Sequence, residues 1–291
     1  MHSITVKAPA KVNLFLKVLG RRKDSYHNII TIFERISLFD TIRISKIPKG
    51  IIIRSDKTIT PDTKDNLAYK AAYAILKREK IRSGVKIDIR KRIPIASGLG
   101  GGSSDAAAVV NGINRLFCLK LSDKALLNVA KELGADVPFF MLDAAFAIGE
   151  GRGDELKVIR SKQRFWHLII KAGNKTSTGD IYEAFDDISK RLTPPGESVK
   201  MSIPSKLRMG YAQAESILHN DLERAVLLKN SVISGIFDRL TELLDKKMIV
   251  SGSGPSIFCL YRTRREAIGA RAKILKSVRA GSRTGWQIFV V

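Results

Sequence analysis

The chain has few cysteines, few aromatic side chains and no long apolar run. Its two cysteines among 291 residues, Cys118 and Cys259, lack the spacing of a metal or redox pair, so we expect free thiols in a reducing compartment. No run of about 18 apolar residues is present, which predicts no membrane span. The segment after Met1 has no apolar signal-peptide core. Together these absences predict a cytoplasmic protein without a membrane partner.

Acidic residues are scarce relative to basic ones. Asp and Glu number 28 against 51 Lys and Arg, which gives a formal net charge of +23. This excess favours polyanionic partners, namely nucleic acid, anionic lipid or phosphorylated small molecules. Aromatic residues make up only 7% and do not alternate with the basic ones, which argues against a surface for stacking single-stranded nucleic acid.

The densest basic stretch lies between Arg262 and Arg283. Apolar residues recur within it at three- and four-residue steps, at Ile268, Ala272, Leu275 and Val278. This spacing predicts an amphipathic helix with an apolar stripe and a solvated basic face.

Hydrophobic residues (44%) and charged residues (27%) are balanced as in a globular protein, and apolar periodicity gives the order of its elements. In the first half it predicts strands at 3–8, 12–19, 41–45, 51–54 and 85–90, helices at 65–76, 103–117 and 122–134, and a hairpin at 142–156. In the second half it predicts strands at 165–171, 247–250, 256–261 and 287–291, and helices around 178–190, 205–229 and 231–245 besides the basic one. Regular βαβ alternation is absent, so we expect an α+β fold, with a domain boundary near residue 158.

The strongest local signal is a glycine-rich segment after the strand at 85–90. It contains Pro94, Gly98, Leu99, Gly100, Gly101, Gly102, Ser103 and Ser104. Glycines lack the Cβ atoms that keep a backbone away from a ligand. Free amides and serine hydroxyls at the start of the next helix, together with the positive end of its dipole, favour an anion. The segment therefore predicts a phosphate-binding loop.

Three common motifs are excluded for this loop and its surroundings. The dipeptide Gly-Lys occurs nowhere, which excludes a Walker loop. A GxGxxG pattern that starts at Gly98 ends on Ser103 instead of glycine, and no GxSxG elbow is present. A different kind of nucleotide-binding loop remains.

Three segments together resemble the motifs of the GHMP kinase superfamily. These are Ala8–Leu14, Pro94–Ala107 and Ser251–Ser256, which are similar to its first, second and third motifs. Further segments resemble the branch that acts on a cytidine diphosphate-linked methylerythritol, namely 25–27, 133–139, 145–149 and 220–223. Ser25 stands where that branch usually has glycine before Tyr-His, which bears on the local turn geometry. The similarity runs in order from residue 3 to about 260.

The resemblance implies a two-domain GHMP kinase fold. Residues 1–158 would form an ATP-binding domain similar to domain 2 of ribosomal protein S5, and residues 159–291 an α/β-plait-like domain, with the active site in the cleft between them. It implies an ATP-dependent kinase of the non-mevalonate (MEP) isoprenoid pathway that phosphorylates the 2-hydroxyl of the cytidyl substrate. Mg²⁺ is expected to bridge the β and γ oxygens of ATP, with Ser103 and water, because no carboxylate cage stands out in the sequence. We expect a monomer or a homodimer.

The same resemblance assigns Asp136 and Lys11 as the catalytic residues. Asp136 would orient the acceptor hydroxyl and take its proton late, and Lys11 would offset negative charge on the reacting oxygens. From the residues alone, Asp136 also fits a helix N-cap and Lys11 a solvated strand edge. Asn13 projects from the same strand face as Lys11 and is expected to bond substrate hydroxyls.

Other positions of the resemblance would hold the two substrates. Tyr26 and Tyr182 supply faces on which cytosine can stack, and His27 supplies an edge contact. Asn66 fits both an adenine or ribose contact and a plain helix N-cap. The weaker substrate contacts are Thr178, Gly252 and Gly254, of which the two glycines allow a close backbone approach.

Two other readings of the sequence remain open. A GHMP kinase of the homoserine or mevalonate type shares the loops but has no use for a cytosine clamp. A basic nucleic-acid-binding protein fits the charge of +23. The three kinase motifs in order argue against nucleic acid as the main partner.

Overall fold

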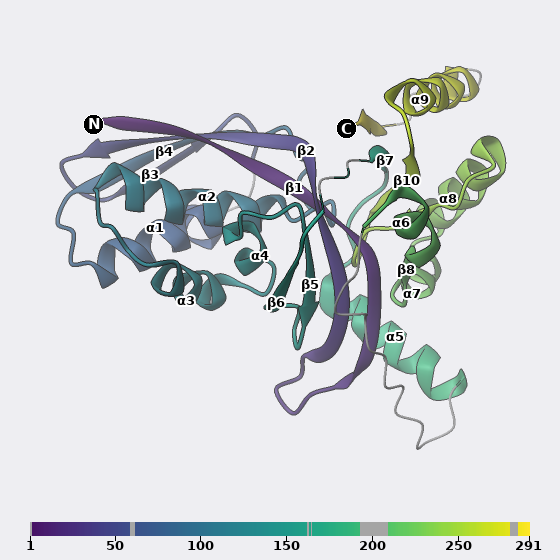
Figure 1. The fold of residues 1–291 in the computed structure, drawn as a ribbon, viewed down its shortest axis with the longest axis horizontal. Coiled ribbons are helices and arrows are strands. Elements are labelled where there is room, and N and C mark those ends of the chain that lie inside the picture. Colours follow the sequence, from purple (N-terminus) through teal and green to yellow (C-terminus); the bar gives the residue numbers. More distant parts are fainter. Residues whose placement is uncertain (1, 59–61, 162, 164, 193–208, 280–284) are drawn as a thin grey trace.

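A long β-hairpin runs through most of the molecule. In a computed structural model, which describes residues 2–58, 62–161, 163, 165–192, 209–279 and 285–291, strands β1 (Ser3–Arg21) and β2 (His27–Ile47) pair antiparallel along almost their full length. The hairpin links the helices α1–α4 on one side to the helices α5–α9 on the other (Figure 1). Its pairing register shifts between Pro9 and Ala10 and between Asn13 and Phe15. Such bulges bend a strand and redirect its side chains.

The larger sheet has seven strands, in the order β3-β4-β2-β1-β8, with β5 and β6 attached to β2. Its remaining strands are β3 (Ile51–Ser55), β4 (Gly84–Arg90), β5 (Phe146–Glu150), β6 (Glu155–Ile159) and β8 (His219–Asn220). The helices of the first half are α1 (Leu67–Arg78), α2 (Gly101–Leu116), α3 (Asp123–Leu133) and α4 (Val137–Met141), with a short 3₁₀ turn at Thr63–Asp65. They lie together beside the β1–β4 part of this sheet (Figure 1).

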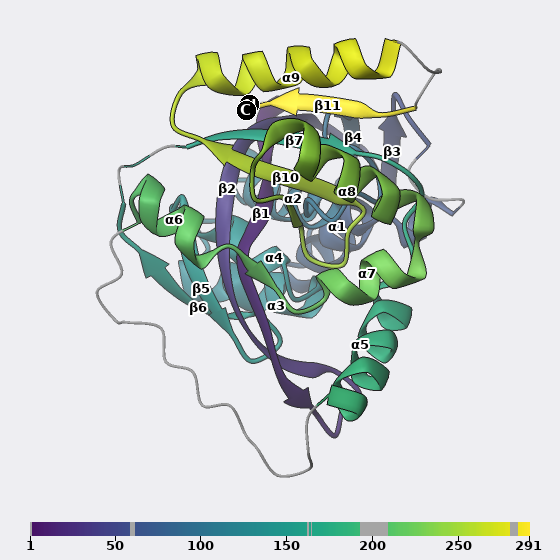
Figure 2. The ribbon, with the colours of Figure 1, turned by 90° about the vertical axis from the view of Figure 1, so that its right-hand side faces the viewer.

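The second sheet has four strands, in the order β11-β7-β10-β9. They are β7 (Trp166–Lys171), β9 (Ile249–Val250), β10 (Ser256–Tyr261) and β11 (Gln287–Val290). The helices of this half are α5 (Thr178–Leu192), α6 (Tyr211–Ile217), α7 (Glu223–Lys229), α8 (Ser231–Leu244) and α9 (Arg264–Arg279). Figure 2 shows α9 and α8 over this sheet, and α5 next to the tip of the long hairpin. None of the helices in the described ranges has the length and apolar content to cross a membrane.

The buried side chains form three clusters, one of which joins the two halves. It contains Val12 and Leu14 of β1, Ile32 of β2 and Phe258 and Leu260 of β10. In addition, β8 from the second half pairs in parallel with β1. The α+β fold is confirmed, and the boundary near residue 158 stays a prediction.

The predicted elements and the structure differ in three places. The strands predicted at 3–8 and 12–19 are one strand, because a bulge absorbs the irregularity after Pro9. The first half of β2 was missed. Its apolar residues are buried on both faces, so they do not alternate with polar ones. The helix predicted at 205–229 is interrupted by β8 between α6 and α7, and its first residues lie outside the described ones.

The apolar stripe predicted for the basic helix was also wrong. The residues of α9 that are buried are Ala267, Ala270 and Ile274, whereas Ile268 is 44% exposed. Ala272 is exposed too, and the side chain of Val278 lies outside the described ones. Small alanines let α9 approach the sheet closely, and a pattern that weights large apolar residues misses such a face.

Candidate active site

A cavity of about 930 Å³ collects residues from all three of the motifs singled out in the sequence. Its lining comes from β1, the start of α2, the segment before α4, the start of α5, and the loop between β9 and β10. Small-molecule sites usually measure ~300–1,000 Å³, so this one is at the upper end of the range.

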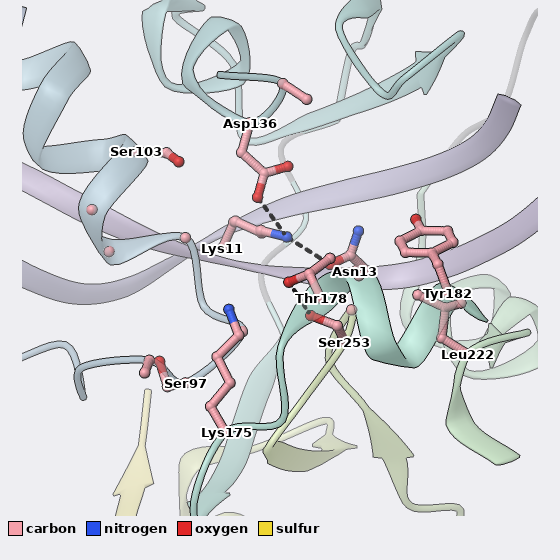
Figure 3. Close-up of a pocket in the computed structure, with 18 of the residues that line it drawn as sticks. Lys11, Asn13, Ser97, Ser103, Asp136, Lys175, Thr178, Tyr182, Leu222 and Ser253 are labelled. Atoms are coloured by element: carbon pink, nitrogen blue, oxygen red, sulfur yellow. Dashed lines mark hydrogen bonds and ion pairs between the residues drawn. The ribbon is translucent and has the colours of Figure 1, made fainter. Parts of the chain in front are cut away.

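Lys11 and Asp136 meet at the centre of this cavity (Figure 3). The Nζ atom of Lys11 is 3.2 Å from Oδ2 of Asp136, and it donates a hydrogen bond of 2.7 Å to Oδ1 of Asn13. The Asn13 amide donates in turn to Thr31, whose hydroxyl donates to the carbonyl of Phe15. The side chain of Lys11 is 6% exposed and that of Asp136 36%. The network therefore holds the lysine fixed and leaves the carboxylate open to the cavity.

Local structure explains why these two side chains face each other. The register shifts of β1 flank Lys11 and Asn13, and a bulge next to a site often redirects a side chain. Asp136 occupies the N-cap position of α4, yet its side chain makes no capping hydrogen bond. The carboxylate is thus free to pair with Lys11, and the plain N-cap alternative for Asp136 does not describe its side chain.

The second glycine motif wraps around the start of α2. Gly98 and Gly100 have φ values of +77° and +70°, in the left-handed region that favours glycine. A Cβ atom on Gly100 would lie 3.0 Å from Cγ of Lys11 and 2.9 Å from Phe140. Gly101, Gly102 and Ser103 form the first turn of α2, where main-chain amides have no intrahelical partner. The turn opens into the cavity and suits an anion.

The second and third glycine motifs touch each other through their backbones. A Cβ atom on Gly98 would lie 2.5 Å from the carbonyl oxygen of Ser251 and 2.7 Å from that of Gly254. The hydroxyl of Ser251 donates to the Gly98 carbonyl, and the amide of Ser256 donates to that of Ser97. The absence of a side chain at Gly98 therefore permits this contact between the two loops.

The segment 220–223 anchors the third motif. The Asn220 amide donates to the carbonyls of Val250 and Gly252, both at 2.8 Å. Asp221 accepts from the amide of Val18, and Glu223 from the amide of Val250. These polar side chains are structural ties between β1, α7 and the loop after β9.

A buried ion cluster supports the loop before α2. Lys91 pairs with Asp105 at 2.8 Å and with Asp40, which also accepts from the amides of Arg92 and Ile93. Burial, which Lys91 partly opposes, raises the pKa of Asp105 to about 7. Sequence patterns gave no sign of this cluster, because its members are far apart along the chain.

An aromatic pair lies at the hairpin end of the cavity. The rings of His27 and Tyr182 stack with centroids 4.7 Å apart, and Nε2 of His27 is 2.9 Å from Oδ1 of Asp186. Tyr26 is 54% exposed and lies under the guanidinium of Arg152, 5.2 Å from it. All five residues line the cavity.

All but three of the predicted site residues line this cavity. Leu99 is fully buried in the core, Ser104 faces another side of α2, and Gly254 packs toward Val226. Ser104 also uses its amide within the helix, where it donates to Gly100. Asn66 lines the cavity and caps α1 by accepting from the amide of Ala68, so the N-cap is confirmed, whereas its contact with adenine or ribose stays a prediction.

The structure adds residues that sequence patterns missed. Lys175 lines the cavity on the side of Lys11 away from Asp136 in the view of Figure 3. Burial and the nearby charge of Lys11 lower the pKa of Lys175, and Asp136 opposes this shift. Thr178 lies 3.1 Å from the hydroxyl of Ser253. A lysine in a loop carries no signal of its own, so only the fold identifies Lys175.

The described residues contain no cluster of three His, Cys, Asp or Glu side chains that suits a metal ion. The Ser103 hydroxyl at the start of α2 is the kind of oxygen that Mg²⁺ accepts beside phosphates, so the donor set fits a metal that enters with ATP and keeps several waters.

The fold and the site together define an ATP-dependent small-molecule kinase of the GHMP type. Residues 66–144 match the family model "GHMP kinases N terminal domain". The chain is 40% identical over 278 residues to 4-diphosphocytidyl-2-C-methyl-D-erythritol kinase of Geobacter metallireducens, which covers 95% of this chain and 96% of that protein. It is 39% identical to the enzyme of that name from Acetivibrio thermocellus, over 92% and 93% of the two chains. The chain belongs to the 4-diphosphocytidyl-2-C-methyl-D-erythritol kinase family.

Solved structures agree with this assignment. A crystal structure of 4-(cytidine 5'-diphospho)-2C-methyl-D-erythritol kinase superposes with a TM-score of 0.77 at 29% identity, over 99% of this chain and 98% of that one. A homoserine kinase from Cytophaga hutchinsonii has a TM-score of 0.70 at 21% identity, over 100% and 94% of the chains, which shows the shared fold alone. The predicted GHMP kinase fold is confirmed.

Proposed function

We propose that this chain transfers the γ-phosphoryl group of ATP to the 2-hydroxyl of 4-diphosphocytidyl-2-C-methyl-D-erythritol. One observation carries the proposal, namely that a single cavity joins the glycine loop, the Lys11–Asp136 pair and the stacked His27–Tyr182 pair. The loop suits a triphosphate and the aromatic pair a pyrimidine, and the acid–base pair lies in the same space. A cytoplasmic location and a monomer or homodimer stay predictions from the sequence.

In the proposed reaction the acceptor oxygen bonds to the γ-phosphorus, the bond to the β,γ-bridging oxygen breaks, and ADP leaves. Asp136 orients the hydroxyl and accepts its proton as the new bond forms. Transition states of this kind are loose, so positioning and charge compensation dominate catalysis. Mg²⁺ bound with ATP would neutralise the β and γ oxygens, and Ser103 is its proposed protein ligand.

Two lysines supply the positive charge of the site. Lys11 is held by Asn13 and Asp136, so it offsets charge without needing to rearrange. We assign Lys175 a similar role, because the described residues give its ammonium no hydrogen bond or ion pair. The side-chain oxygen of Asn13 accepts from Lys11 and its nitrogen donates to Thr31, so Asn13 is mainly a positioning residue.

The aromatic residues would hold the cytosine. His27 stacks on one face of Tyr182 and pairs with Asp186, so it is already engaged. We therefore propose that the cytosine stacks on the other face of Tyr182, with the exposed ring of Tyr26 on the opposite side of the base. Thr178 and Gly252 line the same cavity and are proposed substrate contacts. Asn66, Pro94 and the glycines before Ser103 would line the ATP side.

An ADP-release assay with three acceptors tests the function. We expect turnover with the cytidyl substrate, none with homoserine or mevalonate, and competition by CDP at the acceptor site. If the protein turned over homoserine or mevalonate faster than the cytidyl substrate, the proposal would be wrong and the chain would be a GHMP kinase of the homoserine or mevalonate type. Tight, steeply salt-dependent RNA binding without kinase turnover would support the nucleic-acid alternative.

A further inference from the structure

A second cavity, of about 350 Å³, lies against a different face of α2. Four residues of that helix line it at helical spacing, Ser104, Ala108, Asn111 and Arg115. Strand β1 adds Thr5, Lys7 and Pro9, which share one strand face, and Arg35 of β2 and Phe140 of α4 complete the wall. Because Ser103 and Asp105 line the active-site cavity, the two cavities lie on different sides of the same helical turn.

This second cavity is strongly positive. Lys7, Arg35 and Arg115 contribute three cationic groups, and no Asp or Glu is among the lining residues that the structure describes. Asp143, which is not among these lining residues, acts on Arg35 electrostatically. Neither Lys7 nor Arg115 has an ion-pair partner within the described part of the chain. Such uncompensated charge in a concave site favours an anion.

Two buried polar atoms at this cavity lack hydrogen-bond partners. They are Oγ of Ser104, a residue only 1% exposed, and Nε of Arg35. Buried polar atoms are nearly always paired, and an unpaired one costs stability. Both can donate a hydrogen bond, so an occupant with several acceptor oxygens would satisfy them.

We propose that this cavity is a second anion site, specific for a phosphate group. A phosphate presents several acceptor oxygens and a double charge, which match a lining of cations, hydroxyls and an amide better than a single carboxylate does. The occupant would contact α2, which begins with the glycine loop, and Phe140, which packs against Gly100. The site is independent of the proposed reaction.

Calorimetric titration of the full chain tests the proposal. The active-site cavity is first saturated with adenylyl imidodiphosphate, a non-hydrolysable ATP analogue, so that added anion reports on other sites. Inorganic phosphate, glycerol phosphate and acetate are then titrated separately, and the first two distinguish free phosphate from a phosphate carried on a metabolite. The variants are Arg115→Gln and Lys7→Gln, both at exposed positions, with Arg82→Gln as the control for charge loss at an exposed position outside both cavities.

We expect one equivalent of phosphate or glycerol phosphate to bind to the analogue-loaded protein, and acetate to bind far more weakly. Loss of one charged contact should weaken binding roughly tenfold in Arg115→Gln and Lys7→Gln, with no change in Arg82→Gln. Ser104→Ala should reduce phosphate affinity and raise the melting temperature of the free protein, because it removes an unpaired buried hydroxyl. Absence of binding to the loaded protein, or equal affinity in Arg115→Gln and Arg82→Gln, would overturn the proposal.

Discussion

Gly98 is the position where the glycine loop of the second motif touches the loop of the third motif, and Gly98→Ala tests whether that contact organises the site. The added methyl group would lie 2.5 Å from the carbonyl oxygen of Ser251 and 2.7 Å from that of Gly254. Both neighbours are backbone atoms and cannot rotate away as a side chain can. The backbone at Gly98 also has φ of +77°, which alanine adopts only with strain.

The steric clash and the backbone strain together determine how much Gly98→Ala destabilises the protein. A left-handed conformation costs an alanine about 1–2 kcal/mol, and forcing atoms into a packed interior costs about 1–3 kcal/mol, which together make roughly 2–5 kcal/mol. One kcal/mol shifts the melting temperature of a domain of 150–250 residues by about 2–4 °C, so we expect a decrease of roughly 4–20 °C. Displacement of the loop should also raise the KM for ATP.

Thermal unfolding and steady-state kinetics measure both effects. The control is Gly269→Ala in α9, where nothing lies within 4 Å of the added Cβ and alanine favours the helix. This control should match or exceed the wild-type melting temperature. A Gly98→Ala protein with unchanged melting temperature and unchanged KM for ATP would refute the reasoning about the loop contact.

Substitutions at three further positions test separate parts of the site. Tyr182→Ala should raise the KM for the cytidyl substrate roughly 5- to 150-fold, as expected for about 1–3 kcal/mol of base stacking, while Tyr182→Phe should not; equal effects on the KM for ATP would contradict the stacking role. Lys175→Met should lower kcat/KM roughly tenfold, as for loss of one charged contact, with exposed Lys190→Met as control. Because burial and Lys11 lower the pKa of Lys175, Lys175→Arg should extend activity to higher pH. Asp105 has its pKa raised from 3.8 to about 7, so it stabilises the fold fully below about pH 4 and loses this contribution as pH rises to 7. Asp105→Asn should therefore flatten the decrease in melting temperature between about pH 4 and 7, and an unchanged slope would exclude Asp105 as its source.

Much of the site was predictable because its motifs are local in sequence. The glycine loop is recognisable from four glycines in five residues, and the helix predicted at 122–134 begins with Ser122, which caps α3 by accepting from the amide of Ala125. The family resemblance predicted that Lys11 and Asp136 act together, whereas two residues 125 positions apart in the sequence give no indication by themselves that they are in contact.

Other features depend on tertiary structure and left no local signal. Ser104 looked equivalent to Ser103, yet adjacent residues on a helix point about 100° apart, so only one faces the cavity. Leu99 lies within the glycine loop, but its side chain is buried in the hydrophobic core. In α9, the alanine face is buried because the sheet lies on that side, which no pattern of large apolar residues can show.

The central claim is that Asp136, held against Lys11, works on the acceptor hydroxyl. Asp136→Asn keeps the size of the side chain and removes its charge, so the glycine loop proposed to bind ATP is untouched. Turnover of the cytidyl substrate should fall about 10²- to 10⁴-fold, the usual contribution of a general base, while the dissociation constant for ATP stays within about twofold of wild type. Turnover close to that of the wild-type protein would contradict the account.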